Sequence, residues 1–317
     1  MHLVHWLVRI SVTGLFAVAS VASAQSSRDI WFTLGTGGGP VALASRSQPA
    51  NLLISDTTGV LVDAGDGTAE QLAKIGVPLA RIKAILLSHL HADHVGGLAA
   101  ILALRAQMKI THPLAILGPG GTKGFVDGIQ KALAVVPVSD GSALSSPGEG
   151  VDVMELASGG TIDLGEISVL SIENTHYAID KDDDSRPRSL SFRIRTPWRT
   201  IVYTGDTGPS ADVTRLASGV DLLISEVIDT EAELKTLAPV LAGMPPERIE
   251  GLRNFFRSHH LEINEVANLA KQANPKFVAL THFGRGTEGV EANLRIVSTI
   301  GRSFSGPIVL ARDLDAF

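Results

Sequence analysis

The sequence predicts an α/β fold, and three observations carry this prediction. From Arg28 onward, short apolar runs rich in β-branched residues alternate with segments whose apolar residues recur at helical spacing. The 317 residues are 44% hydrophobic, which is enough to bury a large core. The 32 glycines and 15 prolines indicate many tight turns rather than a fibre or a disordered chain. Because nothing marks a linker, we expect a single domain over residues 25–317.

The first half of the chain alternates strands with helices. Asp56-Thr57-Thr58-Gly59 separates two apolar runs and indicates a β-hairpin. Strands are expected at Ile30–Leu34, Asn51–Ser55, Val60–Asp63, Ile82–Leu87 and Leu114–Leu117. Helices, from the spacing of their apolar residues, are expected at Thr68–Ile75, Leu98–Gln107 and Gly124–Val135.

The second half continues the pattern, with a second hairpin and an amphipathic helix at Ile263–Gln272. Strands are expected at Val151–Glu155, Thr161–Leu164, Ser168–Glu173, Ser189–Arg195, Thr200–Thr204, Asp221–Val227 and Phe277–Leu280. Three stretches are interpreted as loops that determine the substrate: Ser139–Gly150, Asp180–Arg188 and Ile228–Ser258. The charge run at Asp180 is interpreted as a solvated loop rather than a metal site, because adjacent carboxylates repel one another.

The N-terminus is typical of an export signal. Arg9 precedes an apolar run, Ile10–Ala19, and the small residues Ala22-Ser23-Ala24 follow, as signal peptidase requires. The run is shorter than the roughly 20 apolar residues of a membrane span. We therefore expect residues 1–24 to be removed, leaving a periplasmic or secreted protein without a stable membrane anchor. An uncleaved N-terminal anchor is the alternative.

The string His89-Leu90-His91-Ala92-Asp93-His94 gathers four potential metal ligands at the exit of an expected strand. His89 and His91 can point the same way and bind one ion, while Asp93 and His94 turn back toward a second. A lone histidine is usually structural, but a cluster of this density indicates a metal site. Imidazole and carboxylate ligands suit zinc, with manganese or iron as alternatives. With no cysteine in the chain, thiolate ligands and cysteine nucleophiles are excluded.

Three further candidate ligands stand where an expected strand stops and a loop begins. His176, Asp206 and His282 each follow such a strand. Strand ends are where α/β proteins place their chemistry, so these residues are expected to complete sets for two ions. Asp66 is a candidate to hold a ligand imidazole through a hydrogen bond, although a turn aspartate is an equal alternative.

This arrangement resembles the metallo-β-lactamase superfamily over nearly all of the chain after residue 24. The resemblance implies a four-layered αββα sandwich with the site at one edge of its two sheets. It implies two ions, the first held by three histidines, the second by one aspartate and two histidines, and both bridged by Asp206. These ligands are His89, His91 and His176 for the first ion, and Asp93, His94 and His282 for the second.

Within that superfamily the sequence is more similar to ribonuclease Z and its exported, arylsulfatase-like relatives. The strings that carry this similarity are Leu34-Gly35-Thr36-Gly37-Gly38-Gly39-Pro40, Asp63-Ala64-Gly65-Asp66-Gly67-Thr68, Gly118-Pro119-Gly120-Gly121-Thr122 and Ser225-Glu226-Val227. His260, with Glu265 on the following helix, resembles the pair that assists the leaving group. That group usually has Ser or Thr soon after the histidine, whereas this chain has Leu261-Glu262, which leaves His259 and His260 both open as proton donor.

The expected reaction is hydrolysis of an anionic ester, an aryl sulfate or a phosphodiester, by hydroxide generated between two divalent cations. Asp93, His260 and Glu265 are the expected catalytic residues, with His260 protonating the leaving oxygen and Glu265 orienting its ring. The net charge of −6 and the export signal argue for a small-molecule substrate and against nucleic acid. A homodimer is compatible with the sequence. The alternatives are a tRNA 3′-end endonuclease, a lactonase, and a metal-binding protein with little turnover.

Overall fold

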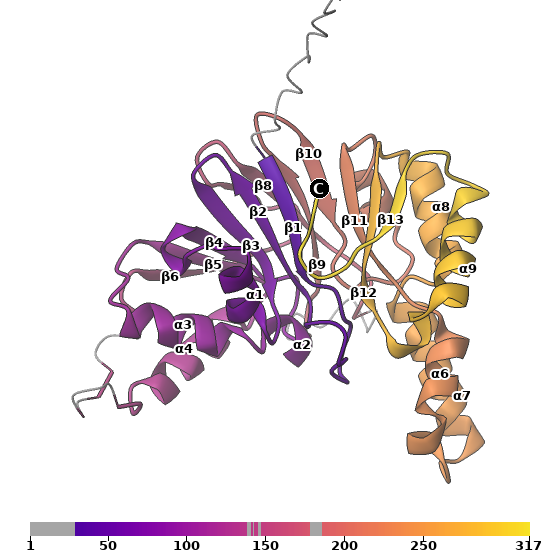
Figure 1. The fold of residues 1–317 in the computed structure, drawn as a ribbon, viewed down its shortest axis with the longest axis horizontal. Helices are drawn as coiled ribbons and strands as arrows, with labels where there is room; N and C mark the ends of the chain where they lie inside the picture. Colours follow the sequence, from indigo (N-terminus) through magenta and orange to yellow (C-terminus); the bar gives the residue numbers. More distant parts are fainter. Residues whose placement is uncertain (1–28, 138–140, 142, 145–146, 178–185) are drawn as a thin grey trace, which may run out of the picture.

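The computed structural model describes residues 29–137, 141, 143–144, 147–177 and 186–317, and the expected signal segment lies outside them. Seven strands form the first sheet, in the order β14-β1-β2-β3-β4-β5-β6 (Figure 1). Their bounds are β1 Asp29–Gly35, β2 Ala50–Ser55, β3 Thr58–Ala64, β4 Ile82–Leu86, β5 Leu114–Gly118, β6 Val151–Glu155 and β14 Asp315–Ala316.

Seven more strands form the second sheet, in the order β13-β12-β11-β10-β9-β8-β7. Their bounds are β7 Thr161–Asp163, β8 Ser168–Glu173, β9 Leu190–Arg195, β10 Thr200–Tyr203, β11 Leu222–Val227, β12 Val278–Phe283 and β13 Ile308–Leu310. In both sheets hairpins pair antiparallel at one side, while β3-β4-β5-β6 and β10-β11-β12-β13 run parallel. Each parallel block brings several strand ends to one edge.

Helices cover the outer faces of both sheets and extend beyond one edge (Figure 1). Their bounds are α1 Thr68–Lys74, α2 Ala92–Val95, α3 Leu98–Gln107, α4 Thr122–Leu133, α5 Ala211–Leu216, α6 Thr230–Leu241, α7 Pro246–His259, α8 Ile263–Ala273 and α9 Val290–Gly301, with short 3₁₀ turns η1 Leu79–Arg81 and η2 Arg285–Thr287. Among the described residues no helix has the length and apolarity that crossing a membrane requires.

The strand periodicity accounts for the layers. On β2, Leu53 packs into the cluster between the two sheets, while its neighbours Leu52 and Ile54 pack beneath the helices that contain Leu72 and Leu98. Alternate residues of a strand point to opposite faces, so a strand buried on both faces carries consecutive apolar residues, as β2 does at Leu52, Leu53 and Ile54. A third apolar cluster packs α8 and α9 against the second sheet. Three apolar clusters between four layers confirm the αββα sandwich.

The expected strands and helices are confirmed, with ends that differ by at most three residues. The interpretation of Ile228–Ser258 as a loop is wrong, because this stretch contains most of the helical hairpin α6–α7. Its start signals are the side chain of Asp229, which accepts a hydrogen bond from the Ala232 amide at 3.0 Å, and Pro246 in the first turn of α7. Parts of the other two expected loops lie outside the described residues.

Candidate metal centre

The seven predicted ligands lie together at one edge of the sandwich. His89 follows β4, His176 follows β8 and Asp206 follows β10, as predicted. His282 instead lies inside β12, which corrects the prediction that it follows the strand. A register shift opposite Glu226 and a backbone φ of 55° at His282 mark a local bulge there. A bulge redirects one side chain of a strand, and this one turns the imidazole of His282 toward the site.

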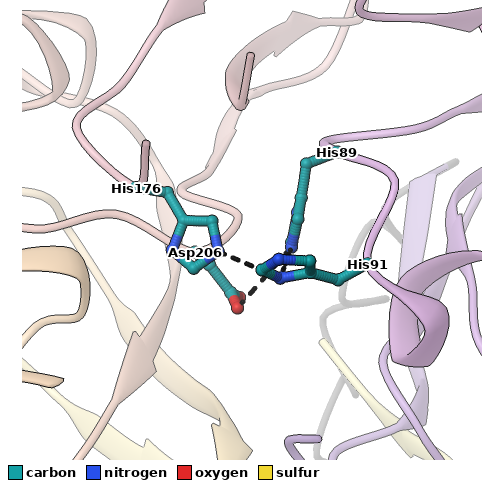
Figure 2. A group of neighbouring side chains, drawn as sticks. All are labelled: His89, His91, His176 and Asp206. Atoms are coloured by element: carbon teal, nitrogen blue, oxygen red, sulfur yellow. Dashed lines mark hydrogen bonds and ion pairs between the residues drawn. The ribbon is translucent and has the colours of Figure 1, made fainter. Parts of the chain in front are cut away.

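The first ligand group brings four side chains onto one point (Figure 2). The Nδ1 atom of His91 lies 3.0 Å from Nε2 of His89 and 3.1 Å from Nε2 of His176. Asp206 Oδ2 lies 3.9 Å from Nε2 of His89. Three imidazole nitrogens and one carboxylate oxygen therefore converge from β4, β8 and β10.

The second ligand group shares Asp206 with the first. Asp206 Oδ1 lies 3.3 Å from Nε2 of His94, and its Oδ2 lies 3.2 Å from Nε2 of His282. Oδ2 of Asp93 lies 3.5 Å from both of these nitrogens. One carboxylate thus faces both groups, as a bridging ligand must.

The glycine-rich loop after β1 packs against this second group. Gly39 donates its amide to Asp93 Oδ2 at 2.8 Å. A Cβ on Gly39 would lie 2.3 Å from Cγ of Asp93, and one on Gly38 would lie 2.7 Å from the ring of His282. The glycines of this loop therefore leave room for the side chains of Asp93 and His282.

Hydrogen bonds on the far side of the rings fix which nitrogen faces inward. His94 places Nδ1 2.8 Å from Oδ2 of Asp63, and His176 places Nδ1 2.9 Å from the carbonyl of His259. His89 places Nδ1 3.0 Å from the Ser88 hydroxyl, which donates to Asp63 at 2.8 Å. Each of these histidines therefore presents Nε2 to the site, an arrangement common around metals.

Asp63, and not the predicted Asp66, is the aspartate that supports the ligands. It is fully buried and accepts further hydrogen bonds from the Ser88 amide at 2.7 Å and the Tyr203 hydroxyl at 2.7 Å. Asp66, three residues later, is exposed in the turn before α1. Asp63 is the penultimate residue of β3 and has a backbone φ of 61°, whereas Asp66 lies in the turn that follows the strand.

We predict that Asp63→Asn weakens metal binding about 10- to 100-fold, the usual cost of losing a ligand's hydrogen-bond partner. An amide NH₂ cannot accept the bonds that both carboxylate oxygens now accept. Competition with a chromogenic chelator measures the affinity, and Asp66→Asn is the matched control with unchanged affinity. Equal affinities for both variants would contradict the role of Asp63.

The electrostatics of the two groups differ. Burial lowers the pKa of His89 far below its ordinary value and that of His176 to about 3, so both imidazoles are neutral and ready to coordinate. Burial also opposes the charge on His282, but the carboxylates of Asp206 and Asp93 outweigh it and raise its pKa to about 10. The pKa of Asp206 is held well below its usual range by His282 and His94, against the effect of burial. The carboxylates of the second group are therefore stabilised by positive charge beside them.

The side chains present fit two divalent cations. Nε2 of His94, Nε2 of His282 and Oδ1 of Asp206 are buried without a hydrogen-bond partner among the described residues. Buried polar atoms are rarely left unpaired, and these three point at the same place. A set of nitrogen and carboxylate donors without sulfur suits zinc, with manganese and iron as alternatives.

His260 lies beside the ligands, and its partner is Glu226. Its Nδ1 lies 2.7 Å from Oε2 of Glu226 and 3.9 Å from Oδ2 of Asp206, and its side chain is buried. Burial lowers the pKa of His260, but Glu226 raises it above the ordinary value. His259 is partly exposed, with Nδ1 3.0 Å from the carbonyl of Phe255. Of the two histidines left open by the sequence, the geometry therefore places His260 at the site.

The prediction that Glu265 orients His260 is wrong. Glu265 lies in the first turn of α8, where its Oε2 accepts a bond of 3.5 Å from Asn268 and its side chain lines a 250 Å³ cavity between α5 and α8. The helix starts two residues before it and turns its side chain away from His260. Glu226 could have been found in the sequence, since it is the only charged residue within the apolar strand Leu222–Val227, and such a carboxylate requires a partner.

Comparisons with known proteins agree with this geometry. A model of the β-lactamase superfamily domain matches residues 58–283. Ribonuclease Z of Mycolicibacterium paratuberculosis is 29% identical over 288 residues, covering 89% of this chain and 95% of the relative. The crystal structure of the short form of human tRNase Z aligns with a TM-score of 0.62 at 22% identity, covering 91% of this chain and 98% of that one. Zn²⁺-bound PqqB from Methylobacterium extorquens aligns with a TM-score of 0.64 at 15% identity, covering 91% and 99%.

Proposed function

The chain belongs to the β-lactamase superfamily, and we propose that this metal-dependent hydrolase cleaves phosphodiester bonds, with RNA as its substrate class. The observation that carries the proposal is the pair of ligand groups that share Asp206 and have the His260–Glu226 pair beside them. The similarity to ribonuclease Z over 89% of the chain supports RNA. It favours the endonuclease alternative over the small-molecule substrate that the charge and the N-terminal segment suggested.

The residues divide the chemistry between them. When bound, two divalent cations lower the pKa of a water molecule and offset the charge that develops on the phosphoryl oxygens. The first ion would be held by His89, His91 and His176, the second by Asp93, His94 and His282, and both by Asp206. Zinc is the proposed metal, which the Zn²⁺-bound structural neighbour supports.

His260 is proposed to protonate the departing oxygen. With Nδ1 held by Glu226, the nitrogen left for the substrate is Nε2. Glu226 is itself fixed, because its Oε1 accepts the Thr207 amide at 2.5 Å, one residue after Asp206. The position of the His260 ring is thereby fixed relative to Asp206. Phosphodiesters of ordinary alcohols need such assistance, since their leaving oxygen is strongly basic.

A second candidate is an exported hydrolase of aryl sulfates, favoured by the signal-like segment Met1–Ala24. A sulfate ester presents the same tetrahedral anionic centre to the two cations, with a small molecule as the partner. A panel of substrates separates the candidates: a short unstructured RNA, bis(4-nitrophenyl) phosphate, 4-nitrophenyl sulfate, a lactone and a β-lactam. Turnover of the two phosphodiesters is expected. Cleavage of the sulfate with no phosphodiester turnover would overturn the proposal in favour of the second candidate.

We predict that the chain is cleaved after Ala24 and resides in the periplasm or outside the cell. N-terminal sequencing of protein made in a bacterial host is then expected to begin at Gln25. The periplasmic and cytosolic fractions of the same culture are compared. Full-length chain in the cytosolic fraction would count against export and would strengthen the RNA assignment.

A further inference from the structure

The hairpin α6–α7 extends beyond the strand ends on the side of the sandwich where α2 lies (Figure 1). None of the residues of α7 is buried, so the helix contributes little to the three apolar clusters. It is nevertheless tied to the site at its end, where the carbonyl of His259 faces Nδ1 of His176 at 2.9 Å. The last turn of α7 therefore forms a wall beside the metal ligands.

Phe255 on this wall packs against its α7 neighbours Phe256 and His259 rather than into the core. Its side chain is 40% exposed, and it belongs to none of the apolar clusters. Its ring centroid lies 4.5 Å from that of His259 and 6.2 Å from that of His260. An aromatic ring left half in water beside a proton donor is suited to contact the group that the donor serves.

Two arginines of the hairpin are engaged in ion pairs. Arg253 and Arg257 both bind Glu231 of α6, and Arg253 also binds Glu250. These ion pairs join the two helices and leave the two arginines engaged. Near Phe255 the wall therefore offers an aromatic surface rather than these two arginines.

Two other aromatic rings lie near the site. Phe256, whose ring centroid is 6.3 Å from that of His260, is less exposed than Phe255. Tyr177 also differs from Phe255. Its ring packs on the first ligand group, with centroid distances of 4.8 Å to His176 and 5.2 Å to His91. Phe255 stands on the side of His260, whose ring lies 4.9 Å from that of His176. Of these rings, Phe255 is the exposed one beside the proton donor, with one side of its ring against His259.

We infer that Phe255 is a specificity residue that stacks on the nucleobase of a nucleotide bound beside His260. This inference rests on the proposed function and names the part of the substrate that the α7 wall recognises. Every nucleobase has a planar face, so stacking selects a nucleotide over a sugar phosphate without reading sequence. The ring acts on binding and position, and the proton transfer stays with His260.

The test compares two ligands that share a phosphate and a ribose. Adenosine 5′-monophosphate and ribose 5-phosphate are titrated into metal-loaded protein by calorimetry. Wild type is expected to bind the nucleotide about 5- to 100-fold more tightly, the usual range for one stacked base. Phe255→Ala and Phe255→Leu are expected to lose this preference while binding ribose 5-phosphate unchanged, and Phe255→Trp to keep it. Met244→Ala, an exposed residue of the same hairpin, is the matched control.

Three results would overturn the inference: equal binding of the two ligands by wild type, an unchanged preference in Phe255→Ala, or weaker binding of both ligands by that variant. Weaker binding of both ligands together would indicate a merely structural role for Phe255. Metal content and circular dichroism verify that the variants are folded. Hydrolysis of bis(4-nitrophenyl) phosphate is measured in parallel. A Phe255-dependent preference without phosphodiester turnover would sustain the stacking role and refute the proposed function, whereas turnover without the preference would do the reverse.

Discussion

Asp206→Ala is expected to release both metal ions and to lower turnover by at least about 10³-fold. One carboxylate faces both ligand groups, with Oδ1 3.3 Å from His94 and Oδ2 3.2 Å from His282. Its loss removes a ligand from each ion and one of the carboxylates that offset the charge of the two cations. Charge stabilisation of several kcal/mol in the transition state is lost with the cations.

Elemental analysis of protein purified without chelator measures the metal directly, independently of turnover. Two ions per chain are expected in wild type and at most a weakly held one in Asp206→Ala. Asp66→Ala serves as control, because Asp66 is an exposed aspartate of the same edge that contacts no predicted ligand among the described residues. A wild-type stoichiometry that stays at one after metal supplementation, or an Asp206→Ala variant that keeps two ions, is incompatible with the bridged site.

His260→Ala is expected to slow hydrolysis by a factor that grows with the pKa of the leaving group, reaching about 10²–10⁴ for the poorest. A proton donor matters little when the departing oxygen is already a stable anion and most when it is strongly basic. Rates are measured on phosphodiesters with leaving groups of rising pKa. A ratio of wild-type to variant rates that stays flat across the series would remove His260 from the mechanism.

Glu226→Gln is expected to show the same trend with smaller amplitude, because the amide can still contact Nδ1 of His260 but carries no charge to sustain its proton. Glu265→Gln is the matched control and is expected to match wild type, since Glu265 faces a different cavity. The two variants thus distinguish Glu265, the partner of His260 predicted from the sequence, from Glu226, the partner in the structure. A loss in Glu265→Gln with none in Glu226→Gln would restore the original assignment.

The metal ligands could be predicted because their signal is local. His89, His91, Asp93 and His94 are close in sequence, so their convergence needs only a strand end and a turn, which apolar periodicity indicates. His176 and Asp206 each follow a strand whose ends were predicted within one residue. The layers could be predicted for the same reason, since alternation along each strand already specifies two buried faces.

Tertiary structure alone decided which carboxylates serve those ligands. Glu265 is five residues from His260 and lies on another face, whereas Glu226 is 34 residues away and lies 2.7 Å from its ring. Likewise Asp63 reaches His94 across the strand ends, while Asp66 points to solvent. Sequence distance measures the length of chain between two groups. Contact depends instead on strand pairing and on the face from which each side chain leaves its element, and both are set by packing across the whole sandwich.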